Sequence, residues 1–389
     1  MLKHLFKLIW NKKKQNALLI SEIFISFIVI FAVFTLIVYN YQNYKKPMGF
    51  DYDNVWTASY TNALQTENND SLSLFYETVR KTVKSMPEVK EVSFSSNNVP
   101  FYQNTSQGGI GYKGNNISSV NWYQVEIGYK DVMNMKVLDG RWFTKEDIVA
   151  KNTPIVINET LKNILFGNES AVGKITEGDK KVIGVVQDVK AKGDYAPSGT
   201  AVYASLDTGS FRWLGKIVIK VIPGADAAFE GKLYKTLANS MKNSSVEIEH
   251  LTDKRTSINY FSLVPMIVLL IVAFFLIINV ALGLFGVLWY NINKRRGEIG
   301  LRRAVGASGN AVSKQLVGEA LVLTTFALII GSFFAVQFPL LNVFDLSANI
   351  YIIALLSTIV FIYLLVIICA FYPGRQAAAV YPAVALHEE

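Results

Sequence analysis

Residues that could form a catalytic or metal site are few in this sequence of 389 residues. Its three histidines, His4, His250 and His387, are far apart, and none has a second ligand at the spacing of a zinc site. The single cysteine, Cys369, lies in an apolar run, where we expect it to pack rather than react. Neither a Gly-x4-Gly-Lys-Ser/Thr phosphate loop nor a Gly-x-Ser-x-Gly nucleophile turn occurs. We therefore expect no catalytic residue, no metal and no cofactor on this chain.

The most concentrated group of charged residues lies between Lys294 and Ser308, and the chemistry it offers is recognition of another protein. Residues 291–296 are predicted to continue an apolar helix, and residues 299–305 to form one or two helical turns that end at Gly306. A short rigid helix of this kind is what a motor subunit would grip. Alternatively, the charges only set membrane topology, although the Glu-Ile-Gly-Leu between them is not needed for that. The candidate coupling residues are Arg296, Glu298, Ile299, Leu301, Arg302, Arg303, Ala304 and Val305.

Two carboxylates, Glu22 and Glu319, lie inside apolar runs, where a charge is costly. Each lies near one end of its run, so the side chain can reach the membrane interface at little cost. One interpretation is a proton or substrate site. The other, which we favour, is pairing with a lysine or arginine near that interface, or a hydrogen bond between helices.

The elements that must position these residues follow from composition. The chain is 51% hydrophobic and only 17% charged, with a mean hydropathy of +0.29, so part of it should lie in lipid and part in water. Four apolar stretches are long enough to cross a bilayer: residues 17–38, 261–290, 316–341 and 350–372. Gly283, Gly286 and Gly331 within them suit close helix packing.

The N-terminal region is predicted to be an uncleaved anchor. The first apolar run has about 22 residues, longer than the about 7–15 of a signal peptide, and no small-x-small cleavage site follows it. Residues 1–16 are predicted to form a cytoplasmic amphipathic helix, which either only anchors the chain or takes part in coupling. Its apolar positions are Leu2, Leu5, Phe6, Ile9 and Trp10.

The excess of positive charge indicates topology rather than nucleic-acid binding. Residues 1–16, 291–315 and 373–389 hold 12 lysines and arginines but three acidic residues, whereas residues 39–260 hold 26 and 24. The positive-inside rule then places both termini and the 291–315 loop in the cytoplasm, and residues 39–260 outside. We expect no nucleic-acid partner, because the basic residues flank the apolar spans.

The outer segment is predicted to be a mixed α and β domain. Residues 54–60, 72–84 and 89–95 form one β-α-β unit, and residues 216–222, 227–241 and 246–250 form a second. Between them we expect strands at 124–128, 154–157 and 181–189, helices at 130–135 and 159–165, and a surface loop or hairpin tip at 97–119. Several aromatic residues either line a binding surface or pack in the core: Phe101, Tyr102, Trp122, Trp142 and Trp213.

Over its whole length the sequence resembles the permeases of the MacB/FtsX-like, or type VII, ABC transporters. The loop Arg296-Gly297-Glu298-Ile299-Gly300-Leu301-Arg302-Arg303-Ala304-Val305-Gly306-Ala307 is similar to the family pattern Arg-x-Glu-Ile-Gly-Ile-Arg-x-Ala-Val/Leu-Gly-Ala. Further similar stretches lie in the outer segment and the tail, at residues 140–144, 154–159, 165–167, 172–174, 183–189, 373–378 and 381–386.

The resemblance implies a fold: an α-helical membrane protein with four transmembrane helices plus a mixed α+β extracytoplasmic domain of the MacB periplasmic core type. The two β-α-β units would form its Porter subdomain, and residues near 97–205 its Sabre subdomain. Residues 298–304 would be the coupling helix that docks on an ATPase. Residues 39–46 and 250–260 would be stalk helices that carry motion to the outer domain.

The resemblance also implies partners. MacB carries its ATPase on the same chain, and no such domain occurs in this sequence. A separate cytoplasmic ABC ATPase would therefore hold ATP and Mg, and the permease would pair with a second copy or a homologous permease in the bacterial inner membrane. A periplasmic adaptor or lipoprotein is a further expected partner.

The implied function is mechanotransmission, in which ATP hydrolysis moves the outer domains and drives efflux or extraction of a peptide, lipoprotein, antibiotic or toxin. An alternative is an FtsX-like regulator of a cell-envelope hydrolase that transports nothing. A sensor with an outer ligand-binding domain is a third class, but it would need a cytoplasmic signalling domain, and only short cytoplasmic segments are predicted.

Overall fold

The computed structural model describes residues 13–61, 66, 68–206, 214–241 and 244–378. The chain divides into two compact units: residues Asn43–Leu263, here called the sheet unit, and the residues up to Gln42 together with those from Val264, here called the helical unit. Most of the predicted N-terminal amphipathic helix (residues 1–12), the end of the tail (residues 379–389) and Trp213 lie outside the described residues.

Among the described residues of the sheet unit, eleven strands form one mixed sheet. Nine of them follow the order β11-β1-β10-β2-β4-β9-β6-β8-β5, while β3 pairs with β4 and β7 with β8. Pairs β4–β9 and β6–β8 are parallel and the others antiparallel. The strands are β1 Val55–Ser59, β2 Val89–Ser96, β3 Gln107–Tyr112, β4 Asn115–Val125, β5 Val137–Gly140, β6 Thr153–Asn158, β7 Ile175–Thr176, β8 Lys180–Val186, β9 Ala201–Ser205, β10 Leu214–Val221 and β11 Glu247–His250.

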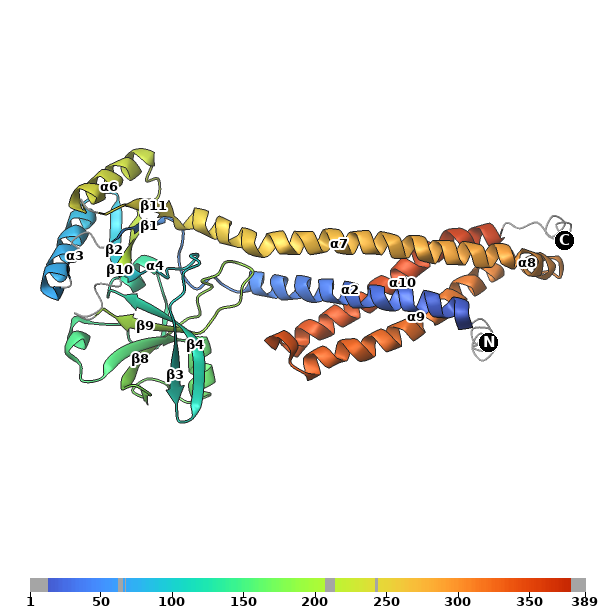
Figure 1. Ribbon diagram of the computed structural model, residues 1–389, viewed down its shortest axis with the longest axis horizontal. Coiled ribbons are helices and arrows are strands. Elements are labelled where there is room, and N and C mark those ends of the chain that lie inside the picture. Colours follow the sequence, from blue (N-terminus) through green and yellow to red (C-terminus); the bar gives the residue numbers. More distant parts are fainter. Residues whose placement is uncertain (1–12, 62–65, 67, 207–213, 242–243, 379–389) are drawn as a thin grey trace. The chain divides into compact units, whose positions relative to one another are not determined.

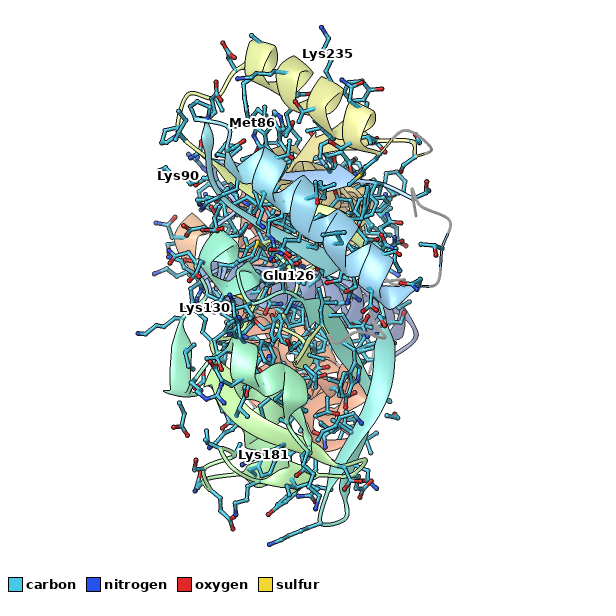
Figure 2. All side chains as sticks on the ribbon, turned by 90° about the vertical axis from the view of Figure 1, so that its left-hand side faces the viewer. Met86, Lys90, Glu126, Lys130, Lys181 and Lys235 are labelled. Atoms are coloured by element: carbon cyan, nitrogen blue, oxygen red, sulfur yellow. The ribbon has the colours of Figure 1, made fainter. Side chains whose placement is uncertain are left out.

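Both predicted β-α-β units are confirmed, and they interleave in one half of the sheet. Helices α3 (Asn69–Lys84) and α6 (Ala227–Ser240) lie side by side over strands β11-β1-β10-β2 (Figure 1, Figure 2). Lys235 on α6 and Lys181 on β8 mark opposite ends of the unit in Figure 2. Apolar residues of both helices form one core with the strands, because each helix places its apolar stripe on the sheet.

The other half of the sheet carries shorter elements. Helices α4 (Tyr129–Met133) and α5 (Glu159–Phe166) confirm the helices predicted at 130–135 and 159–165, and a 3-10 turn covers Lys145–Val149. The strands predicted at 154–157 and 181–189 correspond to β6 and β8. Helix α5 packs Leu161 and Leu165 on the sheet, and Asn158 accepts a hydrogen bond from the backbone N–H of Leu161 at its start.

Two predictions in this half are confirmed only in part. Residues 97–106 form no helix or strand, as expected of a loop, and residues 107–125 form the β3–β4 hairpin. The predicted hairpin tip lies at Lys113 and Gly114, which both have positive φ, as a two-residue hairpin turn requires. The strand predicted at 124–128 is right only for its first two residues, because β4 ends at Val125. The chain turns there toward β2, where the Glu126 carboxylate accepts the backbone N–H of Phe94 at 2.8 Å.

The helical unit holds four helices that are long and apolar enough to cross a membrane, among the residues that the structure describes. They belong to α2 (Lys13–Lys45), α7 (Leu251–Lys294), α9 (Gly309–Leu340) and α10 (Ala348–Ala378). Helices α9 and α10 are an antiparallel pair joined through a short 3-10 turn, Val343–Asp345 (Figure 1). The chain is therefore a multi-pass membrane protein.

Close packing in this unit occurs at two of the three glycines that the sequence singled out. A Cβ at Gly331 would lie 2.4 Å from the Phe27 ring, and one at Gly283 would lie within the Glu22 carboxylate. Gly286, in contrast, has no atom within 4 Å of such a Cβ. Glycine thus lets α2 approach both α7 and α9 closely, as in other helix pairs in lipid.

Two helices continue well beyond their apolar runs. Helix α2 extends past residue 38 to Lys45, and α7 begins at Leu251, ten residues before its predicted span. Pro265 lies inside α7 without ending it. The expected stalk segments, 39–46 and 250–260, are thus helical except at Lys46 and His250, while the membrane boundaries themselves stay predictions.

Candidate functional site

The predicted coupling segment is a separate short helix, α8 (Arg296–Ala304), that follows α7 after a break at Arg295. Glu298 lies in its first turn and Arg302 and Arg303 in its last, which complements the helix dipole. It ends as predicted at Gly306, whose φ is +101°. The N–H of Gly306 bonds to the Arg303 carbonyl and that of Ala307 to the Arg302 carbonyl, a Schellman arrangement that stops the helix.

A closed circuit of five side chains, here called the polar ring, joins α8 to α9. Arg295 donates to Glu298 at 3.0 Å and to Glu319 at 2.8 Å. Glu298 also pairs with Arg302, which donates to Gln315 at 2.8 Å, and Gln315 donates to Glu319 at 3.1 Å. The hydrogen bonds with Glu298 raise the pKa of the Arg295 guanidinium, so this cation stays charged.

An apolar cluster lies beside the polar ring. Ile299 of α8 is only 4% exposed and packs with Ile292 of α7 and with Val312 and Leu316 of α9. Burial of such a side chain contributes about 1.5–3 kcal/mol. Residues 295, 298, 299 and 302 recur at helical spacing, so ring and cluster occupy one side of α8 and hold it against α9.

The other side of α8 carries apolar residues that nothing in the described chain covers. Leu301 is 55% exposed and Val305 is 82% exposed, and Ala304 between them is exposed too. The spacing of 301, 304 and 305 places them on one face, next to the exposed Arg296. An apolar face on a helix held rigidly from behind is suited to bind another protein.

The eight predicted coupling residues therefore fall into two groups. Glu298, Ile299 and Arg302 hold α8 to α9, whereas Arg296, Leu301, Ala304 and Val305 are exposed and Arg303 is half-buried. Of the two carboxylates that lie in apolar runs, Glu319 pairs with Arg295, and Glu22 lies against the backbone of α7 at Gly283.

Arg295 and Gln315 belong to this site but were not among the residues predicted for it. Their spacing from Glu298 and Glu319, three and four residues, is a signal that could have indicated both contacts.

A second candidate site lies where the two stalk helices enter the sheet unit, around residues 190–194. The Lys190 ammonium donates to the carbonyls of Asn43 at 2.8 Å and Lys46 at 3.2 Å, in the last turn of α2. This side chain is almost completely buried, and burial lowers the pKa of Lys190. A cation here satisfies carbonyls that the end of a helix leaves without partners.

Asp194, four residues later, binds the first turns of α7 in the same way. Arg255 approaches both of its carboxylate oxygens, at 3.1 and 3.0 Å, and Asn259 donates to one at 2.7 Å while accepting the Asp194 backbone N–H. Although burial opposes it, the hydrogen bond to Asp194 raises the pKa of Arg255. We call Lys190, Asp194 and these partners the stalk clamp; no spacing in the sequence could have indicated it.

A buried ionic cluster follows at the β11–α7 boundary. Glu249 accepts from Tyr102 at 2.6 Å and pairs with Lys254, and the Lys216 ammonium lies 3.8 Å from it and 3.7 Å from the centre of the Tyr102 ring. Burial lowers the pKa of Lys216 to about 8. Although burial opposes it, the hydrogen bonds from Lys254 and Tyr102 lower the pKa of Glu249.

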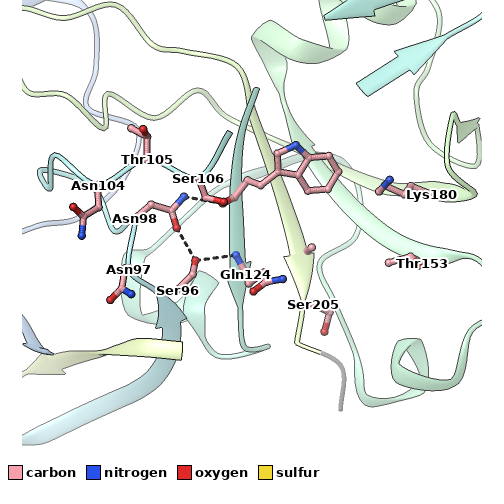
Figure 3. A pocket seen from close by; sticks show the side chains of 12 residues that line it. Ser96, Asn97, Asn98, Asn104, Thr105, Ser106, Gln124, Thr153, Lys180 and Ser205 are labelled. Carbon is pink, nitrogen blue, oxygen red and sulfur yellow. Dashed lines mark hydrogen bonds between the residues drawn. The ribbon is translucent and has the colours of Figure 1, made fainter. Parts of the chain in front are cut away.

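The sheet unit also contains a cleft of about 550 Å³ that the sequence did not reveal. Carboxamide and hydroxyl side chains of residues 96–106 form one wall, and Gln124, Thr153 and Lys180 come from the sheet (Figure 3). Several aromatic residues were predicted either to line a binding surface or to pack in the core. Of these, Trp122 lines this cleft, whereas Phe101 and Trp142 are buried in the core.

No group of three or more histidine, cysteine, aspartate or glutamate side chains that could hold a metal occurs within the described part of the chain.

Comparison with known proteins assigns both halves of the chain. Residues 17–233 match the family model of the MacB-like periplasmic core domain, and residues 258–382 match that of the FtsX-like permease C-terminal region.

Two relatives illustrate the range of similarity. The macrolide export ATP-binding/permease protein MacB of Aggregatibacter actinomycetemcomitans is 29% identical over 233 residues, 57% of this chain and 36% of that protein. The uncharacterized ABC transporter permease YvrN of Bacillus subtilis (strain 168) is 23% identical, and the match covers 100% of both chains. The chain thus spans about a third of the length of the first MacB relatives it matches and the full length of YvrN.

Among solved structures, the periplasmic region of MacB from Actinobacillus actinomycetemcomitans matches 56% of this chain and 98% of its own, with 19% identity and a TM-score of 0.39. The extracellular domain of the ABC-type transporter YknZ from Gram-positive bacteria matches 50% of this chain and 100% of its own, with 18% identity and a TM-score of 0.35.

Proposed function

Because this chain belongs to the MacB/FtsX-like ABC transporter permeases, we propose that it transmits the cycle of a separate cytoplasmic ATPase to its extracytoplasmic domain. The fold class expected from the sequence, four apolar helices with a mixed α and β sheet domain, is the one observed. In this proposal ATP and Mg are held by the partner subunit, and the permease itself performs no chemistry.

The observation that carries the proposal is the two-sided character of α8. One side is held to α9 by the polar ring and by Ile299, and the other exposes Leu301, Ala304 and Val305. A helix that is held firmly to α9 on one side can transmit a displacement applied to its other side. A loosely attached helix would move without transmitting it. The exposed apolar face would supply the buried contact area and the exposed Arg296 the charged rim of the interface.

Transmission from α8 to the outer domain would run along α7. This helix is continuous over 44 residues, from the end of β11 to the residue before Arg295. At its outer end, Asp194 of the stalk clamp holds α7, and Lys190 holds the end of α2. Movement of α7 would thus reach the same short loop that holds α2.

The remaining parts of the assembly are proposed from the family. The protein would act in the bacterial inner membrane as a dimer with a second copy or a homologous permease, with both termini in the cytoplasm. A periplasmic adaptor or lipoprotein would contact the outer domain, and the substrate would be a peptide, lipoprotein, antibiotic or toxin.

Disruption of the exposed face of α8 tests the coupling role. The full-length tagged chain is purified from its native host with the ATPase that accompanies it, and Val305→Asp is compared with Ile175→Asp, an exposed apolar residue of β7 in the sheet unit. We expect Val305→Asp to lower the ATPase recovered per permease by about tenfold or more and Ile175→Asp to leave it unchanged. Equal recovery with Val305→Asp would contradict the proposal.

Topology is tested in a Cys369→Ala background. A membrane-impermeant maleimide is applied to intact spheroplasts carrying either Lys192→Cys, at an exposed position of the sheet unit, or Val305→Cys. We expect labelling of the first and none of the second until the membrane is permeabilised. The reverse pattern would overturn the assignment of α8 to the cytoplasm.

A further inference from the structure

The cleft beside Gln124 is built as a binding site, and the coupling proposed above makes no use of it. Its volume of about 550 Å³ falls within the range of about 300–1,000 Å³ that is usual for ligand sites. The cleft lies next to the apolar cluster that α5 forms with the sheet around Leu161. Trp122 belongs to both, and the other residues that line the cleft are mostly polar. In Figure 3, Asn104 and Thr105 lie on one side of the cleft and Lys180 and Thr153 on the other.

The edge of β4 that faces residues 96–106 is hydrogen-bonded to them at Trp122 and Gln124. The N–H of Trp122 donates to the Ser106 carbonyl at 2.8 Å, its carbonyl accepts from the Asn98 carboxamide at 2.7 Å, and the N–H of Gln124 donates to the Ser96 hydroxyl at 3.1 Å. The other edge of β4 pairs with β9. A ligand therefore cannot be added here as an extra strand and must be recognised by side chains.

Three carboxamides are available for recognition. Within the described residues, those of Asn97, Asn104 and Gln124 line the cleft and have no hydrogen-bond partner. Each offers one acceptor and two donors close together. This combination is complementary to a peptide group, which presents one carbonyl and one N–H.

One cation accompanies these neutral groups. The Lys180 ammonium lies 5.3 Å from the centre of the Trp122 ring, and no carboxylate of the described residues lies within ion-pair distance of it. An ammonium in a cleft without acidic residues favours a ligand that carries a carboxylate.

The indole of Trp122 is not open as a stacking platform for a sugar ring. Lys180 lies over it, and Gly108 presses so closely on its pyrrole edge that a Cβ there would lie 2.9 Å from Nε1. The ring thus forms part of the wall, which leaves the carboxamides and the cation as the recognising groups.

From these observations we propose that this cleft binds a short extended peptide segment through its backbone, with a carboxylate of the ligand placed at Lys180. The proposal rests on the cleft alone and is independent of the coupling role of α8.

The test uses the full-length chain in lipid nanodiscs and measures dissociation constants by saturation-transfer NMR. The probes are N-acetyl-Gly-Ala-Ser-Ala with a free carboxylate, the same peptide as its C-terminal amide, and chitotriose. We expect the acid peptide to bind about tenfold more tightly than the amide. Lys180→Met should make the two peptides equal, and Gln124→Met should weaken both by about fivefold or more.

Lys181→Met is the matched control, because the neighbouring residue on the same strand does not line the cleft; it should leave every dissociation constant unchanged. Thermal unfolding midpoints equal to wild type show that the variants are folded. Absence of saturable binding of the acid peptide up to about 10 mM overturns the proposal. So does tighter binding of chitotriose, or an unchanged acid-to-amide ratio in Lys180→Met.

Discussion

The two ends of α7 are held by different chemistry. At its N-terminal end, the outer end in the proposed topology, Arg255 and Asn259 converge on one buried carboxylate, Asp194. At its C-terminal end, the inner end in the proposed topology, Arg295 shares two carboxylates with Arg302 and Gln315 in a circuit, where Glu298 is 44% and Glu319 20% exposed. A buried centre with one set of partners fixes a geometry, because losing any member leaves a desolvated charge. In the polar ring, which is closer to water, any two side chains are connected in both directions around the circuit. Removal of one side chain therefore leaves the others connected.

This difference fits the work proposed for each end. The inner end would be bound and released by a partner in every cycle, which requires contacts that can rearrange. The outer end would transmit the movement of α7 to the sheet unit, which requires contacts that keep a fixed geometry. Four substitutions test this contrast, and they are given in order of decreasing expected effect.

The largest loss should follow Asp194→Ala. Arg255 would keep its charge in a half-buried position without a partner, and Asn259 would lose the bond that it donates to the carboxylate, so we expect destabilisation of about 3–4 kcal/mol. The thermal unfolding of the full chain in detergent measures this. Lys192→Met, an exposed change in the same loop, should have no effect. If both variants behave alike, the clamp does not fix the outer end.

A pH-dependent gain in stability should come from Lys216. Its pKa is about 8 in the folded protein and about 10.4 in the unfolded chain, so between these values only the unfolded state holds the proton. Stability should therefore increase as the pH rises from about 8 to about 10, by on the order of 2 kcal/mol.

Unfolding midpoints of wild type and Lys216→Met across this pH range provide the measurement. The variant should lack the increase, and Lys90→Met, at an exposed site of β2, should retain it. A rise of the same size in all three proteins would show that the buried ammonium is not its source.

A smaller effect is expected for Arg295→Met in the polar ring. The change removes the contacts to both Glu298 and Glu319, and we expect a cost of about 1 kcal/mol. Hydrogen exchange of the backbone amides of α8 reports it directly, as faster exchange over residues 299–304. Arg375→Met on α10 serves as the control, with exchange in α8 unaffected.

The smallest effect is expected for Arg302→Met, at about 0.5 kcal/mol, because this arginine is 39% exposed and Arg295 still joins α8 to α9. The same exchange experiment measures it. Loss of protection as large as that in Arg295→Met would show that the ring does not act as a circuit with two routes.

Much of the architecture was predictable because its signals are local. The β-α-β units were predicted from helical and alternating periodicity, as in the stretch that forms α3. The glycine at position 306 predicted the end of α8, and the structure shows it there with a left-handed φ. The extent of strands β3 and β4 was not predicted, because asparagine, serine and glycine, which are common in turns, make up nine of the 19 residues 107–125.

Apart from the local pairs of the polar ring, the sites depend on tertiary contacts that no spacing reveals. Asp194 meets Arg255 across 61 residues of sequence, and Lys190 meets Asn43 across 147. Glu319 could be identified as costly in an apolar run, but its partner Arg295 follows only from the packing of α9 against the end of α7. Likewise, the carboxamides of the cleft come from β4 and from the segment between β2 and β3, which the sequence does not place side by side.

Pro265 gives α7 a mechanical character of its own. Proline has no backbone N–H, so the carbonyl of Phe261 one turn earlier lacks its helical bond, and the helix is easiest to bend at that level. Twist about the axis still passes through, because the chain and the surrounding helical bonds are continuous. If α7 transmits the ATPase cycle as proposed, it would act as a drive shaft with a flexible coupling, carrying rotation and thrust while bending near Pro265 to take up misalignment between its two ends.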